Sequence, residues 1–181
     1  MPAFDDILRH FQRQVALNWR PDVPPAGRVW ILWYDKALDR RVRGRIHELE
    51  EATVAAGHGW RHFDLAPLFP AWIARHEFFP DLVNMPEELQ GLLPEFAQAV
   101  TDGVRGALEG GDTNDLLALS GCGALFGLTR VSSLIGEVAQ MIPGRLLLLF
   151  PGRHSAGVYR LLDAREGWNY HAVPIPAADA Y

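Results

Sequence analysis

The sequence contains a single cysteine, Cys122, and a single lysine, Lys36. One cysteine excludes an internal disulfide and any zinc site built from several cysteines. The longest apolar run, Leu146–Pro151, is far shorter than the ~20 residues of a membrane-spanning helix. The first ten residues include Asp5 and Asp6 and lack the basic and apolar regions of a secretion signal. We therefore expect a cytoplasmic protein with no membrane contact.

The 181 residues carry a net charge of −5, and 49% of them are hydrophobic. This length fits one domain with its own core, which needs no metal or disulfide for stability. An acidic chain is a poor match for duplex DNA, whose binders gain affinity by neutralising phosphates. Direct contact with nucleic acid is therefore disfavoured.

Apolar segments rich in branched and aromatic residues alternate with helical patterns, which favours an α/β fold. The sheet is predicted to be mainly parallel and flanked by helices on both faces. Two later segments alternate in polarity, as expected for a C-terminal antiparallel edge hairpin. The predicted parallel strands are Arg28–Tyr34, Trp60–Leu65, Leu116–Ser120 and Arg145–Phe150, and the hairpin strands are Val158–Asp163 and Trp168–Val173.

The sequence divides into an N-terminal helix with its linker, an α/β domain and a C-terminal tail. Residues 1–27 are predicted as an N-terminal helix with one apolar stripe, followed by a proline-rich linker. Residues 28–173 form the α/β domain, and residues 174–181 form a C-terminal tail. Within the domain, one helix is expected to be capped by Asp35 or Asp39 and to stop at Gly57. Others are predicted over Pro67–Phe79, Glu87–Leu108 and Leu134–Met141, although Gly91 and Pro94 weaken the start of the third.

Ligands of parallel α/β sheets bind beyond the carboxyl ends of the strands. After the third strand, Gly121 and Gly123 begin a glycine-rich segment that extends to Gly127. Such a segment turns backbone amides toward an anion, or simply provides a tight turn between strand and helix. It lacks the Lys-Ser/Thr pair of a phosphate-binding loop. Both interpretations, a nucleotide- or anion-sensing loop and a structural turn, remain open.

A second candidate segment follows the fourth strand, where Pro151 is expected to end the strand. Arg153, His154 and Ser155 are adjacent polar residues there. They are candidates for an anion site, and the alternative is a plain connection to the edge hairpin. Cys122 has no cationic neighbour in the sequence to activate it. No histidine spacing matches a metal motif, so we predict no metal, no cofactor and no catalytic residues.

Four arginines cluster in the first helix of the domain, namely Arg40, Arg41, Arg43 and Arg45. A basic patch is one way to contact DNA weakly. The acidic Glu48, Glu50 and Glu51 follow at once and counter that interpretation. A partner-protein surface that includes Arg40, Arg41 and Arg45 is the favoured hypothesis.

Several short motifs, taken in order, resemble those of a known family. They are Trp33-Tyr34-Asp35, Phe63-Asp64-Leu65, the turn Ser120–Phe126, Leu149-Phe150-Pro151-Gly152, Val158–Leu162 and Trp168–Ala172. Together they resemble the BrxB family of the BREX (bacteriophage exclusion) defence systems, and the likeness runs from about Arg28 to Val173.

The resemblance implies a non-catalytic component of a multi-protein antiviral system. Its partner would be a PglZ-type protein, which is alkaline-phosphatase-like, and other BREX subunits are further partners. The family has no catalytic residues to transfer to positions of this sequence. We therefore expect an adaptor, and the alternatives are the anion-sensing loop and weak DNA contact described above.

Overall fold

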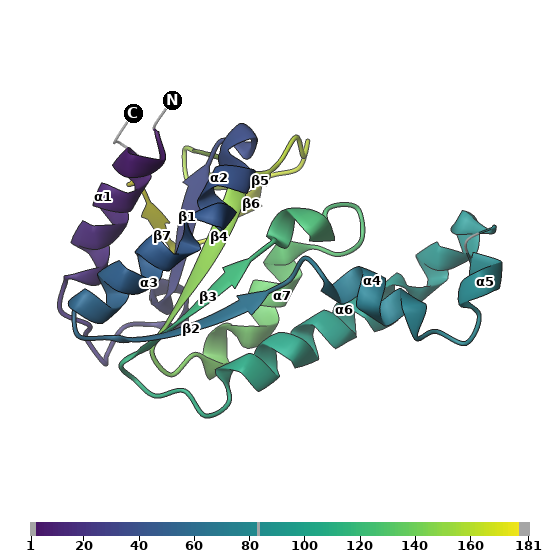
Figure 1. Ribbon diagram of the computed structural model, residues 1–181, viewed down its shortest axis with the longest axis horizontal. Coiled ribbons are helices and arrows are strands. Elements are labelled where there is room, and N and C mark those ends of the chain that lie inside the picture. The colour runs from purple at the N-terminus through teal and green to yellow at the C-terminus, as the bar shows by residue number, and fades with distance from the viewer. Residues whose placement is uncertain (1–2, 83, 178–181) are drawn as a thin grey trace.

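A parallel sheet runs through the middle of the computed structural model, which describes residues 3–82 and 84–177 (Figure 1). Its five parallel strands lie in the order β2-β3-β4-β1-β7. Two short antiparallel strands follow, because β5 pairs with β4 and β6 pairs with β5. The strands are β1 Val29–Tyr34, β2 Gly59–Asp64, β3 Asp115–Ser120, β4 Arg145–Ser155, β5 Val158–Leu161, β6 Trp168–Asn169 and β7 Val173–Ile175. The predicted α/β fold, with its parallel sheet and antiparallel edge strands, is confirmed.

Helices cover both faces of this sheet. One face carries α1, α2 and α3, and the other carries α4, α6 and α7. The short α5 packs on α6 rather than on the sheet (Figure 1). The helices are α1 Phe4–Val15, α2 Asp39–Gly44, α3 Ile46–Ala55, α4 Leu68–Ala74, α5 Phe79–Leu82, α6 Pro86–Leu108 and α7 Val131–Val138.

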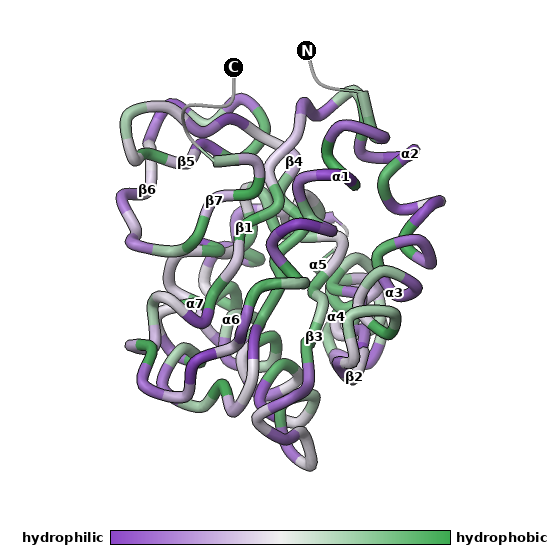
Figure 2. Tube along the Cα trace, turned by 90° about the vertical axis from the view of Figure 1, so that its left-hand side faces the viewer, coloured by the Kyte–Doolittle hydropathy of each residue, from purple (hydrophilic) through white to green (hydrophobic). Residues whose placement is uncertain are grey.

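The central strands are apolar on both sides because both sides are covered. In β4, Leu147 and Leu149 pack toward α1 and α3, while Leu146 and Leu148 pack toward α6 and α7. Figure 2 shows these hydrophobic strands in the middle of the molecule and hydrophilic stretches on outer segments such as α2. The residues that alternate along each strand thus form two cores, one on each face of the sheet.

The N-terminal helix follows its predicted apolar stripe. Phe4, Ile7, Phe11 and Val15 are buried in the same cluster as strands β1 and β4. Asp5 and Asp6 lie in the first turn, where a negative charge is favourable to the helix dipole. Helix α1 therefore closes one face of the sheet.

Two predicted segments differ from the structure. The single helix expected to follow Asp35 or Asp39 and to stop at Gly57 is the short turn η2 (Lys36–Leu38) and then two helices, with a break at Arg45 directly after Gly44. Glycine has a low helix propensity, and the break is consistent with that. Strand β4 does not end before Pro151 but continues to Ser155. Gly152 makes this possible, because a Cβ there would lie 2.1 Å from the carbonyl oxygen of Arg160 on β5.

The C-terminal strand also differs from the prediction. The edge hairpin is shorter than expected, because only Trp168 and Asn169 form β6. Val173–Ile175 then forms β7, which pairs in parallel with β1 instead of starting a tail at Pro174. A proline is tolerated there because β7 is an edge strand. The rest of the predicted tail, from residue 178 to 181, lies outside the described residues.

The longest helix, α6, is uninterrupted over 23 residues although it contains Pro94. Its C-terminal half packs on the sheet, while its N-terminal half extends away with α5, at the right of Figure 1. Over the part of the chain that the structure describes, neither α6 nor any other helix has the length and apolarity to cross a membrane.

Candidate functional site

A polar network lies at the carboxyl ends of β2 and β3, with Ser120 buried at its centre and His62 exposed at its edge. The Ser120 hydroxyl donates to Asp64 Oδ1 over 3.2 Å and lies 2.8 Å from His62 Nε2. Arg43 of α2 reaches the same carboxylate at 3.3 Å. Ser120 is only 2% exposed, so its hydroxyl is out of reach of an external substrate. The network ties β2, β3 and α2 together and serves the fold.

Sequence reasoning did not assemble this network, although the signal was present. Strand alternation places His62 and Asp64 on one face of β2, and the parallel register pairs Asp64 with Ser120. The missing information was the order of the strands. Once β2 and β3 are neighbours, the three side chains have to meet.

The glycine segment after β3 begins as a tight turn. Gly121 adopts φ +76°, in the left-handed region, and η3 (Cys122–Leu125) follows. Cys122 is buried, and its thiol donates to the Leu149 carbonyl over 3.1 Å. Burial raises the pKa of this thiol, so it is protonated at neutral pH. The start of the segment is therefore a structural turn, and a Cβ at Gly123 would meet Pro151 and Leu162.

The polar residues after Phe150 do not converge on one point. Because they lie on strand β4, Arg153 and Ser155 are exposed on one side while His154 points to the other. The His154 ring lies 4.3 Å from the ring of Tyr159, centroid to centroid. Its buried Nδ1 has no hydrogen-bond partner among the described residues. Burial lowers the pKa of His154 below the usual value.

This histidine gives a testable pH dependence. The unfolded chain binds a proton at His154 at a higher pH than the folded chain does. The neutral His154 therefore contributes its full share of folding stability above the ordinary histidine pKa of about 6.5. That contribution is lost as the pH falls below this value and toward the lowered pKa of the folded state. Burial also lowers the pKa of His62, so that residue acts in the same direction.

We expect the thermal midpoint to fall between about pH 7.5 and pH 5.5. The change is measured by differential scanning calorimetry. The fall should be smaller in His154→Gln than in the parent chain, and smaller again in a variant that also carries His62→Gln. An equal fall in all three proteins would show that other groups cause it.

Of the arginines predicted to form a partner surface, one binds within the chain and two are exposed to solvent. Arg45 binds Glu48 and Asp5, and its guanidinium lies 4.2 Å from the Phe4 ring centroid. It therefore joins α1 to α3. Arg40 and Arg41 are exposed on α2. These two arginines are the part of the predicted surface that is open to a partner.

An apolar groove lies on the other side of the sheet, between α4 and α6. One hollow of about 460 Å³ is lined by the apolar Leu68, Trp72 and Phe96, among others. The ring centroids of Trp72 and Phe96 are 5.4 Å apart. A second hollow of about 440 Å³ follows along α6 and includes Phe78 and Leu92. The hollows share His76 and Glu95, so they form one continuous surface, which we call the α4–α6 groove.

Two features distinguish the α4–α6 groove from the rest of the surface. Phe78 is 55% exposed at its outer end, and Phe79 beside it is exposed as well. The sequence from residue 66 to residue 96, which includes α4, α5 and most residues that line the groove, contains five acidic residues and one arginine, a net charge of −4 out of −5 for the chain. Those acidic residues are Glu77, Asp81, Glu87, Glu88 and Glu95. Of these, Glu77, Glu88 and Glu95 line the two hollows, where Arg75 is the one arginine among the described residues. The groove therefore has an apolar floor and a rim in which carboxylates outnumber the arginine.

Comparisons with known proteins add no relative. No family model matches the chain, and no curated protein or solved structure matches it either. Within residues 3–82 and 84–177, no group of three or more His, Cys, Asp or Glu side chains is placed to hold a metal ion.

Proposed function

We propose that this chain is a non-catalytic adaptor that acts in the cytoplasm by holding a partner protein in the α4–α6 groove. The observation that carries the proposal is the apolar groove itself, with Phe78 and Phe79 exposed at its end. Large exposed aromatic side chains next to a hollow are typical of protein interfaces, where aromatic residues provide much of the binding energy.

The shape and charge of the groove select the partner segment. An apolar groove between two packed helices can bind the apolar face of a third helix. The acidic rim then favours lysine and arginine on the flanks of that helix, because opposite charges speed association and fix its register. We therefore propose a basic amphipathic helix as the occupant.

The resemblance to the BrxB family supplies the proposed partner. In a BREX-type defence system, that helix would belong to a PglZ-type, alkaline-phosphatase-like protein. The exposed Arg40 and Arg41 lie on α2, on the opposite face of the sheet from α4 and α6 (Figure 1). They would leave a second surface for another BREX subunit.

The experiment is co-purification of the tagged chain with the PglZ-type protein encoded beside it, followed by calorimetry on the separate proteins. We expect a one-to-one complex that weakens as salt is added, because rim charges are screened over about 10 Å at 0.1 M salt. No complex at any salt concentration would contradict the proposal. A complex insensitive to salt would contradict the role of the acidic rim.

A further inference from the structure

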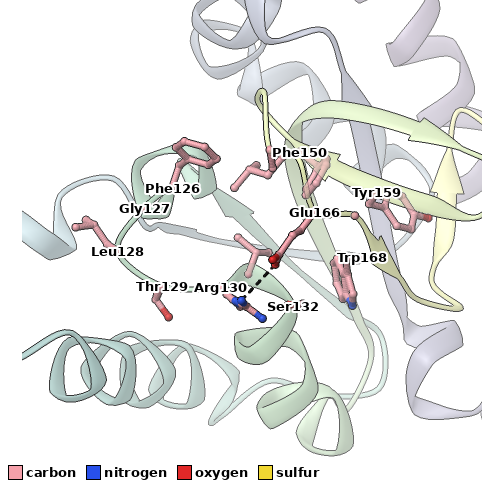
Figure 3. Close-up of a pocket in the computed structure, with 14 residues that line it drawn as sticks. Phe126, Gly127, Leu128, Thr129, Arg130, Ser132, Phe150, Tyr159, Glu166 and Trp168 are labelled. Atoms are coloured by element: carbon pink, nitrogen blue, oxygen red, sulfur yellow. Dashed lines mark ion pairs between the residues drawn. The ribbon is translucent and has the colours of Figure 1, made fainter. Parts of the chain in front are cut away.

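A pocket of about 420 Å³ lies beside the C-terminal half of β4, away from the α4–α6 groove. The segment from Phe126 to Ser132 forms one wall, and the β5–β6 hairpin forms the other. Figure 3 shows Phe126 on one side and Phe150, Tyr159 and Trp168 on the other. A volume of this size lies in the range of small-molecule sites, which are concave and mostly apolar.

The walls of the pocket are aromatic. Tyr159 lies 5.9 Å from both Phe150 and Trp168, measured between ring centroids. Trp168 is stacked on Tyr170 at 4.7 Å, so its ring is held in place from behind. Phe126 across the pocket is 49% exposed. A planar ring is the group that such walls bury best, because offset and edge contacts between rings add to apolar burial.

Polar groups gather at the side where α7 begins. Arg130 directly precedes α7, and Thr129 and Ser132 line the pocket next to it. The first backbone amides of a helix have no carbonyl partner within the helix, and they carry its positive end. Arg130 and the two hydroxyls, next to the positive end of α7, together favour a bound anion.

One carboxylate already occupies this position. Arg130 forms an ion pair of 3.2 Å with Glu166 of the opposite wall, drawn as a dashed line in Figure 3. The two side chains are 76% and 81% exposed. An ion pair this exposed is weak because water screens both charges, so an incoming anion can displace Glu166 from Arg130.

We infer that this pocket binds a small aromatic anion, with its ring between Phe126 and Trp168 and its anionic group on Arg130. The Glu166 carboxylate takes the place of that anionic group when the pocket is empty. This inference does not depend on the adaptor role, because the pocket shares no residue with the α4–α6 groove.

Two anionic probes separate the sources of such a ligand. They are adenosine 5′-monophosphate, which carries a phosphate, and indole-3-acetate, which carries a carboxylate. Adenosine and inorganic phosphate are the controls, each with one half of the proposed chemistry. Titration calorimetry should show binding of at least one anionic probe, and it should be at least about tenfold tighter than either control.

Two variants at the ion pair should act in opposite directions. Arg130→Gln should weaken binding of that probe about tenfold, because a charge-assisted contact is lost. Glu166→Gln should tighten it by roughly twofold to fivefold, because the competing carboxylate is gone. Both side chains are exposed, so neither change threatens folding. Arg165→Gln is the matched control, because Arg165 lies on the same hairpin but does not line the pocket.

The inference fails if neither anionic probe binds at about 1 mM. It also fails if Arg130→Gln and Arg165→Gln have equal effects, or if Glu166→Gln weakens binding. Binding of adenosine as tight as that of its monophosphate would equally overturn the proposed anion contact.

Discussion

Phe78→Ser should reduce the affinity for the proposed PglZ-type partner by about thirtyfold, the change expected when an aromatic anchor of an interface is removed. Phe78 is 55% exposed, so the fold does not depend on its burial. The thermal midpoint should therefore stay unchanged while binding is lost. Titration calorimetry with the partner measures the first effect, and scanning calorimetry of the free chain measures the second.

Matched controls exist elsewhere on the surface. Leu17 and Val54 are each 57% exposed, and Val54 lies on α3, across the sheet from the groove. Leu17→Ser and Val54→Ser remove similar apolar surface, and both should leave the affinity within about twofold of the parent. Equal losses of affinity in all three variants would mean that nonspecific apolar contacts, and not the α4–α6 groove, hold the partner.

Gly121→Ala should unfold the chain at a markedly lower temperature. Gly121 has φ +76°, in the left-handed region, where a residue with a Cβ such as alanine loses free energy. A Cβ there would also lie 2.5 Å from Asp64 Oδ1 and 2.7 Å from the Ala66 backbone nitrogen. The Asp64 carboxylate cannot move aside freely, because it accepts hydrogen bonds from Ser120 and from Ala66.

The expected loss for Gly121→Ala is roughly 3–5 kcal/mol, the sum of left-handed strain and overpacking. Gly127→Ala is the matched control. Gly127 has φ +78° in the same segment, but a Cβ there would meet nothing within 4 Å. It should lose only the strain, about 1–2 kcal/mol. Chemical denaturation measures both, and equal losses would show that the contacts to Asp64 and Ala66 are unimportant.

Local sequence patterns predicted those strands and helices that bury an apolar face, because burial leaves a periodic apolar pattern in the sequence. The four apolar strands and the stripe of α1 were found because their side chains alternate or repeat with the period of the element. Proline was less informative. Pro151 was expected to end β4, yet the strand continues, and Pro94 lies inside an unbroken α6.

The candidate sites depended on tertiary packing, which local patterns do not record. The α4–α6 groove exists because α4 and α6 pack side by side, with 22 residues between Trp72 and Glu95. The pocket at Arg130 needs the hairpin residue Glu166 to fold back over the start of α7. The sequence predicted a candidate site in the segment after β3. In the structure, the later part of that segment, Phe126–Ser132, lines a pocket, whereas Gly121 and Gly123 do not line it. The arginine and adaptor hypotheses remain predictions.

The proposed adaptor role is tested most directly by amide hydrogen exchange on the chain alone and in complex with the PglZ-type protein. In the complex, amides of α4, of α5 and of the N-terminal half of α6 should exchange more slowly, because these helices would pack against a bound helix. Amides of α1 and α3, on the opposite face, should exchange at the same rate in both samples. Protection confined to that opposite face, or no protection in a complex that forms, would contradict the assignment of the α4–α6 groove.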